Sequence, residues 1–128
     1  MEKNKHIDVG VASMLGKYSD AVLTGEGKRW LYTSGTPGLA ADGSLPPDFE
    51  SQARLAWSHV MSMLEAAGMD VGDIVKLTQS LIRRSDLEAY RAIRNEHLGD
   101  ARPASMLSFV SGLATPDILI EIEVVAAR

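Results

Sequence analysis

The side chains best suited to chemistry in this sequence are two carboxylates near its C-terminus, Glu121 and Glu123. Residues 118–125 read Ile-Leu-Ile-Glu-Ile-Glu-Val-Val, and every second side chain of a strand shares one face. The two glutamates therefore lie together on a face that is otherwise apolar. Carboxylates in such a setting suit acid–base chemistry. The alternative, which this strand taken alone favours, is an exposed edge strand whose charges prevent association with other strands.

Composition narrows the classes of protein that the chain can represent. With 128 residues, 45% hydrophobic and 23% charged, it is expected to fold as one domain over residues 1–128. The absence of cysteine excludes disulfides, thiolate nucleophiles and zinc–thiolate sites. The three histidines share no ligand spacing, so no metal site is predicted. No apolar run approaches the ~20 residues that span a bilayer, and the N-terminus lacks the apolar core of a signal peptide. These features predict a cytoplasmic protein without a membrane partner.

The charge pattern does not favour nucleic acid as a partner. The formal net charge is −4, and the basic residues are scattered along the chain. The pair Arg83-Arg84 stands close to Asp86 and Glu88. Binding to phosphates normally requires a basic face, and none is visible in the sequence.

Helical periodicity is clearest in the middle of the chain. Asp48 is a suitable N-cap after two prolines, and Gly68 is a suitable C-terminal stop. The apolar stripe between them consists of Phe49, Ala53, Ala56, Trp57, Val60, Met63, Leu64 and Ala67. A second helix is predicted to begin at Ser85, with a capping box in Ser85-Asp86-Leu87-Glu88, and to end at Gly99.

Five strands are expected around these helices. The first two, at residues 20–24 and 29–34, are predicted to form a hairpin around the glycine-containing residues 25–28. A loop follows at residues 35–47, and the remaining strands are predicted at residues 74–82, 104–110 and 118–125.

Two amphipathic helices can cover only one face of such a sheet. The other face would carry Thr78, Ser80 and Glu121 among apolar neighbours. A monomer would expose this partly apolar face to water. A closed homo-oligomer that packs these faces together is therefore expected, with the polar residues in clefts between subunits.

Several segments resemble the RidA/YjgF family of proteins. The similarity runs from about Lys17 to the end of the chain, with the pieces in the family's order and spacing. The matching segments are Lys17-Tyr18-Ser19-Asp20-Ala21-Val22, Thr33-Ser34-Gly35, Glu65-Ala66-Ala67-Gly68 with Val71-Gly72-Asp73-Ile74-Val75-Lys76, Pro103-Ala104, and Ile120-Glu121-Ile122-Glu123.

The resemblance implies an α+β fold of the chorismate-mutase-like type, with two helices packed on one face of a mixed sheet. It also implies a homotrimer whose three inter-subunit clefts bind a small-molecule substrate. Typical members hydrolyse enamines and imines to 2-keto acids and ammonia without a cofactor. By this resemblance, Glu121 positions or activates the attacking water, while Tyr18, Ser34 and Gly35 shape the pocket. Partial burial would favour this role by raising the pKa of Glu121.

The sequence departs from the family at the position after Pro103-Ala104. Active imino-acid deaminases of the family carry an arginine there, which clamps the substrate carboxylate, whereas this chain has Ser105. A neutral hydroxyl cannot replace a charged two-pronged donor, so weak activity on ordinary 2-imino acids is expected. Arg91 and Arg102 are the candidate substitutes. The alternative for Arg91 is a solvated charge on the helix surface, and Arg102 lies at an odd offset from Ser105.

Three functions compete. The first is a deaminase-like hydrolase acting on imines or enamines, with Ser105 shifting its substrate range. The second is a non-catalytic protein that binds a metabolite or a protein partner in the same clefts. A third, an endoribonuclease or translation inhibitor, is disfavoured by the acidic charge and the lack of a histidine pair.

Overall fold

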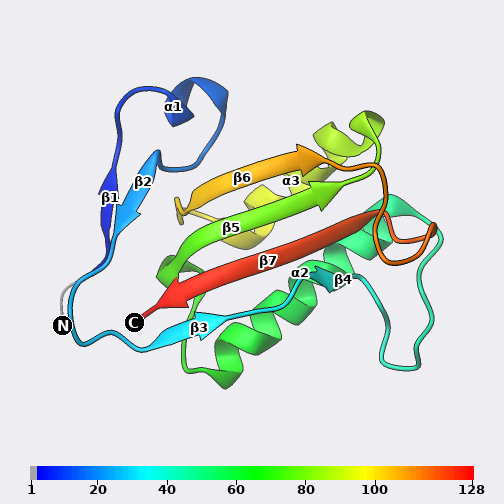
Figure 1. The fold of residues 1–128 in the computed structure, drawn as a ribbon, viewed down its shortest axis with the longest axis horizontal. Coiled ribbons are helices and arrows are strands. Elements are labelled where there is room, and N and C mark those ends of the chain that lie inside the picture. Colours follow the sequence, from blue (N-terminus) through cyan, green and yellow to red (C-terminus); the bar gives the residue numbers. More distant parts are fainter. Residues whose placement is uncertain (1–2) are drawn as a thin grey trace.

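A mixed five-stranded sheet organises the chain in the computed structural model, which describes residues 3–128 (Figure 1). Strand β7 pairs antiparallel with β3, β4 and β5, whereas β5 and β6 run parallel, giving the order β3-β7-β5-β6. The strands are β3 (Trp30–Tyr32), β4 (Thr36–Pro37), β5 (Ile74–Leu81), β6 (Ala104–Phe109) and β7 (Ile120–Ala127). The predicted α+β architecture with a mixed sheet is confirmed.

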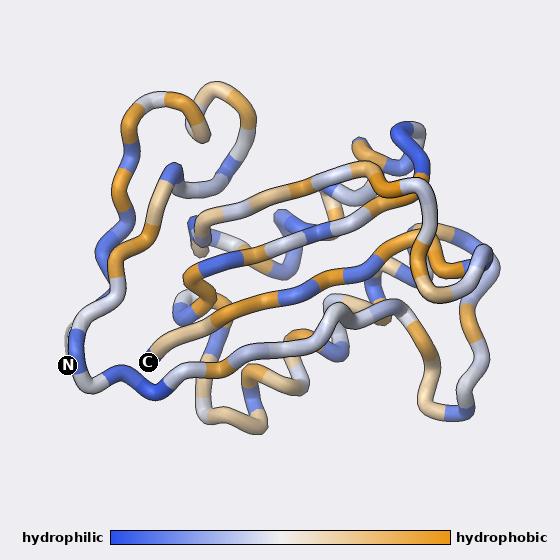
Figure 2. The backbone as a smooth tube through the Cα atoms, viewed as in Figure 1, coloured by the Kyte–Doolittle hydropathy of each residue, from blue (hydrophilic) through white to orange (hydrophobic). Residues whose placement is uncertain are grey.

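The two faces of the sheet differ in the way that the alternation of β7 predicted. Ile118, Ile120, Ile122 and Val124 are buried, whereas Glu121 is half-buried and Glu123 exposed. Figure 2 shows the same alternation of apolar and polar residues along β7. The apolar side chains of β7 therefore face the core, and the glutamates face the other way.

Helices α2 (Phe49–Ala66) and α3 (Leu87–Leu98) cover the apolar face of the sheet, and no helix within residues 3–128 covers the opposite face (Figure 1). The carboxylate of Asp48 accepts a hydrogen bond from the Ser51 amide at 2.9 Å, so the predicted N-cap is confirmed. Trp57 and Val60 on α2 are fully buried in the same core as the apolar residues of β7. No helix within residues 3–128 is both long and apolar enough to cross a membrane.

The second helix begins differently from the prediction. Residues Arg84–Asp86 form a 3-10 turn, η2, and α3 starts only at Leu87. Ser85 therefore lies inside the turn, and α3 has no side-chain cap at its N-terminus. The Asp86 carboxylate instead accepts a hydrogen bond from Arg83 Nε at 2.8 Å. The capping box was wrong, whereas Gly99 ends the helix as predicted, with a φ of +56° that favours glycine.

The predicted hairpin of residues 20–24 and 29–34 was also wrong. Strand β2 (Ala21–Leu23) pairs with β1 (Lys5–Ile7), a strand that the sequence analysis missed together with the short helix α1 (Ala12–Leu15) and strand β4. Strand β3 pairs with the end of β7, beginning at Trp30 opposite Ala127. Both strands thus pair with segments distant in sequence, and the glycine-containing segment between them connects β2 to β3 without forming a hairpin. Figure 1 shows β1 and β2 projecting beyond the edge of the main sheet.

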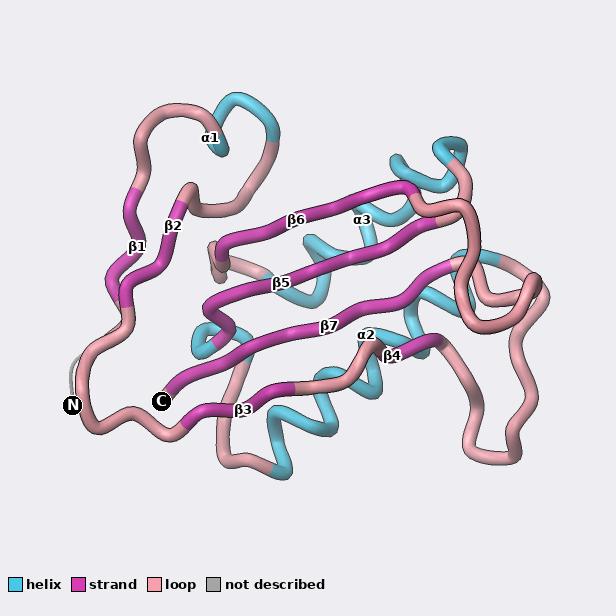
Figure 3. The backbone as a smooth tube through the Cα atoms, in the orientation of Figure 1, coloured by secondary structure: helices cyan, strands magenta, loops and turns pink. Residues whose placement is uncertain are grey.

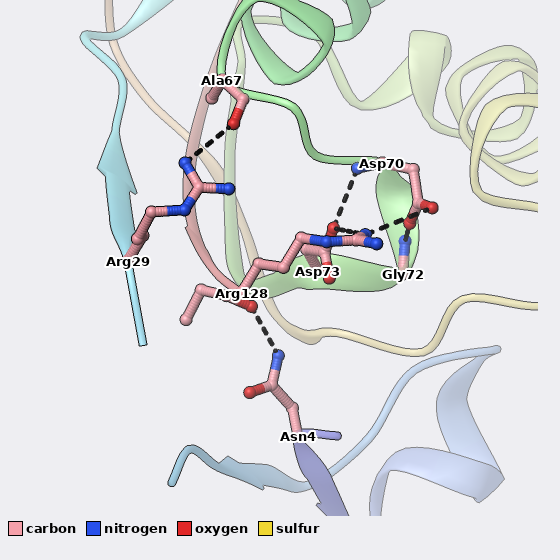
Figure 4. A network of polar contacts seen from close by, with 8 residues as sticks. Asn4, Arg29, Ala67, Asp70, Gly72, Asp73 and Arg128 are labelled. Atoms are coloured by element: carbon pink, nitrogen blue, oxygen red, sulfur yellow. Dashed lines mark hydrogen bonds and ion pairs between the residues drawn. The ribbon is translucent and has the colours of Figure 1, made fainter. Parts of the chain in front are cut away.

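Polar contacts hold the C-terminus between these parts of the chain (Figure 4). The guanidinium of Arg128 lies 3.1 Å from an Asp73 carboxylate oxygen and 3.9 Å from one of Asp70. Asn4 Nδ2 donates to the Ala127 carbonyl at 3.0 Å, and Arg29 Nη1 donates to that of Ala67 at 3.1 Å. Strand β7 is therefore fixed at the end that pairs with β3.

Gln52 fixes the opposite end of β7 from within helix α2. Its side chain is almost fully buried, and its Nε2 donates to the carbonyls of Pro46 at 2.8 Å and Asp117 at 2.9 Å. Its Oε1 accepts from the Leu119 amide at 2.9 Å. One side chain thus joins the long loop between β4 and α2 (Figure 3) to the segment that leads into β7.

The substitution Gln52→Leu should lower the free energy of unfolding by about 2–4 kcal/mol, because it leaves buried carbonyl and amide groups without partners. Urea denaturation of both proteins measures this difference. Ser58→Ala, at an exposed position of the same helix, is the control and should change stability little. Equal stability of Gln52→Leu and the wild type would show that these loops are held by other contacts.

Candidate functional site

The carboxylate of Glu121 lies directly against Gly35 on the helix-free side of the sheet. A Cβ atom added to Gly35 would overlap Glu121 Oε1 and lie 3.0 Å from Glu121 Cδ. The backbone at position 35 therefore approaches the carboxylate more closely than any other residue type would allow. The sequence-predicted residues Gly35 and Glu121 are brought together within one chain.

The segment that carries Gly35 is held in place by pairing with β7. The Thr33 amide donates to the Val124 carbonyl at 3.0 Å, and Thr33 Oγ1 accepts from the Val124 amide at 3.0 Å. Beyond Gly35, β4 pairs Pro37 with Glu121. Ser34 lies between these anchors, and its carbonyl accepts a hydrogen bond from Thr36 Oγ1 at 3.0 Å. The predicted Thr33-Ser34-Gly35 motif is thus the chain segment that passes beside Glu121.

Ser105 lies on the opposite, helix-covered side of the sheet. It is paired in register with the fully buried Leu77, and its Oγ accepts a hydrogen bond from Gln79 Nε2 at 3.0 Å. The Tyr90 hydroxyl on α3 donates to Gln79 Oε1 at 2.6 Å. Burial raises the pKa of Tyr90 far above its ordinary value, so this hydroxyl remains a neutral donor. Ser105 therefore ends a buried polar chain that begins on α3.

Tyr18 lies near the start of β6. Its ring atoms Cδ1 and Cε1 are each 3.4 Å from where a Cβ of Gly16 would stand. The next residue, Ser19, bridges to Ala104 and donates its amide to the Pro103 carbonyl at 3.1 Å. Tyr18 is therefore held beside the strand that carries Ser105.

A cleft of about 870 Å³ opens between this N-terminal segment and the end of α3. Its lining includes Gly16, Tyr18, Ser19, Leu98, Ala101 and Arg102. Asp70, Val71 and Gly72 also line it. The cleft is thus bounded by three parts of the chain that lie far apart in sequence, and the predicted pocket residue Tyr18 stands in its wall.

The two arginines considered as substitutes for the clamp each have other partners, although Arg102 also lines this cleft. Arg91 Nη1 lies 3.3 Å from Glu88 Oε1 on the exposed side of α3. Arg102 Nη1 donates to the carbonyls of Gly99 and Ala101, both at 3.0 Å.

Sequence reasoning missed a third arginine, Arg94, which is only 7% exposed. Its spacing of four residues from Tyr90 places both on one face of α3. Tyr90 and Arg94 therefore both belong to the buried face of the helix. A charged residue on the core face of a helix was the signal that the sequence offered.

The predicted site residues thus form two groups within one chain. Glu121 and Gly35 lie on the helix-free face of the sheet. Ser105 and Tyr18 lie at the β6 edge, where the Ser105 side chain faces the helices. Strand β5 separates β6 from β7, so Ser105 and Glu121 are neither on the same face nor on neighbouring strands. No group of three or more histidine or acidic residues suited to holding a metal occurs in the described part of the chain.

Comparison with known proteins gives a consistent result over nearly the whole chain. A family model described as "Endoribonuclease L-PSP" matches residues 11–128. The 2-iminobutanoate/2-iminopropanoate deaminase of Escherichia coli is 35% identical over 119 residues, covering 89% of each protein. The putative reactive intermediate deaminase TdcF of the same organism is 31% identical, covering 89% of this chain and 88% of that protein.

Solved structures agree with the sequence matches. A protein of unknown function from Yersinia pestis, YyfB of the Rid family, superposes with a TM-score of 0.87 at 27% identity, covering 99% of this chain and 100% of that one. The YjgF gene product of E. coli gives a TM-score of 0.72 at 30% identity, covering 97% and 98%.

The substitution Gly35→Ala should displace the Glu121 carboxylate, because the added methyl group needs the space that Oε1 occupies. A crystal structure of the variant measures the displacement. Gly112→Ala is the matched control, since a Cβ at Gly112 would meet no atom within 4 Å. An unmoved Glu121 in Gly35→Ala would show that the backbone at residue 35 yields instead.

Proposed function

This chain belongs to the RidA/YjgF family, whose model carries the description "Endoribonuclease L-PSP", and from that membership we propose that it hydrolyses reactive imines or enamines. The observation that carries the proposal is the Glu121 carboxylate seated against Gly35. It provides one proton-accepting group at a fixed position on the helix-free, partly apolar face of the sheet.

The reaction requires little from the protein. The carbon of a protonated imine is already electrophilic, so a positioned water can add to it while Glu121 accepts a proton from that water. The same carboxyl group then returns the proton to nitrogen. The C–N bond then breaks while the hydroxyl group of the adduct gives its proton back to Glu121, leaving a carbonyl compound and ammonia. An enamine enters the same sequence after protonation at carbon gives the imine.

The complete site requires more than one copy of the chain. Glu121 and Ser105 lie on opposite faces of one sheet, so a substrate between them must contact two subunits. The helix-free face also exposes large apolar side chains, with Tyr32 at 70% and Met106 at 55% exposure. Packing these faces together would bury them and bring Glu121 of one subunit toward the β6 edge of another. We infer a homotrimer, as in the family, with a substrate cleft at each interface.

The expected mass in solution at micromolar concentration is therefore three times the 13.8 kDa of one chain. Light scattering after size-exclusion chromatography measures it. The exposed Tyr32 offers a further check, since Tyr32→Glu should weaken assembly by placing a charge in the interface. A monomeric mass for the wild type would remove the basis for a site shared between subunits.

Ser105 sets the expected substrate range. Its hydroxyl already accepts a hydrogen bond from Gln79, so only its own proton remains to donate to a ligand. One neutral donor binds a carboxylate less strongly than a two-pronged guanidinium. The preferred substrates are therefore imines or enamines whose binding depends less on a carboxylate at this position.

The substitution Ser105→Arg should raise ammonia release from 2-imino acids, which an amino-acid oxidase generates in the assay. An incorrectly placed guanidinium can forfeit on the order of a hundredfold in rate, so the gain should stay below the activity of arginine-bearing relatives. Glu121→Ala is the blank, and Glu65→Ala, an exposed carboxylate on α2, is the matched control. Wild-type activity equal to that of such relatives would show that another group holds the carboxylate.

Ser105 also favours the second candidate, a non-catalytic protein that binds metabolites or a protein partner in the same clefts. This candidate predicts ligand binding without ammonia release from any imine or enamine. The endoribonuclease named in the family description would instead degrade RNA, a reaction that the net charge of −4 does not favour.

A further inference from the structure

Arg94 is a buried cation that has no carboxylate partner among the residues that the structure describes. It is 7% exposed, yet none of the ion pairs within residues 3–128 includes it. The cations of Arg54, Arg83, Arg91 and Arg128 all have acidic partners, although they are far more exposed. Because burying an unpaired charge is costly, such a group is retained where an anion can reach it.

The contacts of Arg94 leave most of its hydrogen-bonding capacity free. Its Nε lies 3.4 Å from Asn95 Oδ1, and its guanidinium carbon stands 5.9 Å from the Tyr90 ring centroid. Burial lowers the pKa of Arg94, and the charge of Arg91 lowers it further, while Tyr90 and Tyr18 act in the opposite direction. A guanidinium nevertheless remains protonated at physiological pH. Its terminal N–H groups have no acceptor within the described residues.

The free end of this guanidinium lies beside the cleft next to Tyr18. Its Nη2 is 3.9 Å from where a Cβ of Gly16 would stand, and Gly16 and Tyr18 both line the cleft. Two side-chain polar atoms within residues 3–128 are fully buried without a hydrogen-bond partner, Asn4 Oδ1 and Trp57 Nε1. The terminal nitrogens of Arg94 are not among them, so these nitrogens are not sealed in the core. The acidic residues Asp8, Asp70 and Asp100 also line the cleft, whereas Arg94 does not, so an anion approaches its terminal nitrogens at the wall formed by Gly16 and Tyr18.

Arg94 is also connected to the position where the family's arginine is missing. Tyr90, one helical turn before Arg94, donates to Gln79, and Gln79 donates to Ser105. This buried chain fixes the ring that lies under the guanidinium. Tyr18, which like Arg94 lies against Gly16, is held at the start of the strand that carries Ser105.

We propose that Arg94 binds the carboxylate of the substrate from helix α3, taking over in part the role of the arginine that Ser105 replaces. The inference rests on the proposed function and specifies its substrate class, an imine or enamine that bears an anionic group. The carboxylate is held by a guanidinium that α3 positions against the Tyr90 ring. The reacting carbon is therefore placed differently from that in relatives that carry an arginine at the position of Ser105. Arg94 is thus a residue that sets specificity.

Binding of 2-oxobutanoate, a stable keto-acid product analogue, tests the assignment without requiring catalysis. Isothermal titration of the wild type should detect binding, and Arg94→Met should weaken it roughly 10- to 100-fold through loss of a charge-assisted contact. Arg94→Lys, which retains the charge, should restore part of the affinity. Arg54→Met, an exposed arginine paired with Glu96, is the matched control and should bind as the wild type does. Butanone, which lacks the carboxylate, should show no dependence on residue 94.

Kinetics with 2-imino acids provides a second measurement. Arg94→Met should raise KM more than it lowers kcat, and it should leave the KM of a neutral imine unchanged. Failure of wild-type ammonia release on every imine would contradict the proposed function, whereas the titration would still assess Arg94.

Three results would overturn the role of Arg94. The first is unchanged 2-oxobutanoate affinity in Arg94→Met, or no binding by the wild type. The second is an equal loss of affinity in Arg91→Met with none in Arg94→Met, which would assign the contact to Arg91. The third is dissociation of the oligomer in Arg94→Met with wild-type affinity per folded subunit, which would identify an ion pair with an acidic residue of another subunit. If Arg94→Met does not fold, the test uses Arg94→Lys. Reduced affinity of that variant for 2-oxobutanoate, with the same oligomeric mass as the wild type, then supports the role of Arg94.

Discussion

The burial of every second side chain of β7 against α2 is the constraint on which the rest of the structure depends. Ile120, Ile122 and Val124 must face the core, and a shift of one residue would place Glu121 and Glu123 there instead. The register of β7 is therefore strongly fixed. Because β7 also pairs with β3, β4 and β5, its register determines where Gly35 passes and which carboxylate it meets.

A second constraint is polar and lies within the helix-covered core. Gln79 occupies a core-facing position of β5, where its amide must find partners. It finds them in Tyr90 on α3 and Ser105 on β6, together with the Met106 carbonyl at 3.0 Å. The same bonds join the helix to the edge strand. An arginine at position 105 would have to leave this network or replace it, so the departure from the family involves Gln79 and Tyr90 as well as Ser105.

These two constraints place the residues of the proposed site on opposite faces of one sheet. The alternation of β7 places Glu121 on the helix-free face, while the network on the other face holds Ser105 and supports Arg94. Under the proposed function, a substrate that needs both a carboxylate base and a cation binds where two copies of the sheet meet. The exposed apolar residues of the helix-free face supply a driving force for that assembly.

The sequence by itself determined the elements whose periodicity is strong, namely helix α2 with its cap at Asp48, strand β5 and the two faces of β7. Its motifs also identified the family, and the resemblance pointed to Gly35 and Glu121, which the structure brings together. It did not determine the partners of β2 and β3, the face of Ser105 or the burial of Arg94. Those depend on which distant segments meet, and a local turn signal such as residues 25–28 is weaker than pairing with β7. Tertiary structure alone decided that the carboxylate and the buried cation lie on opposite sides of one sheet.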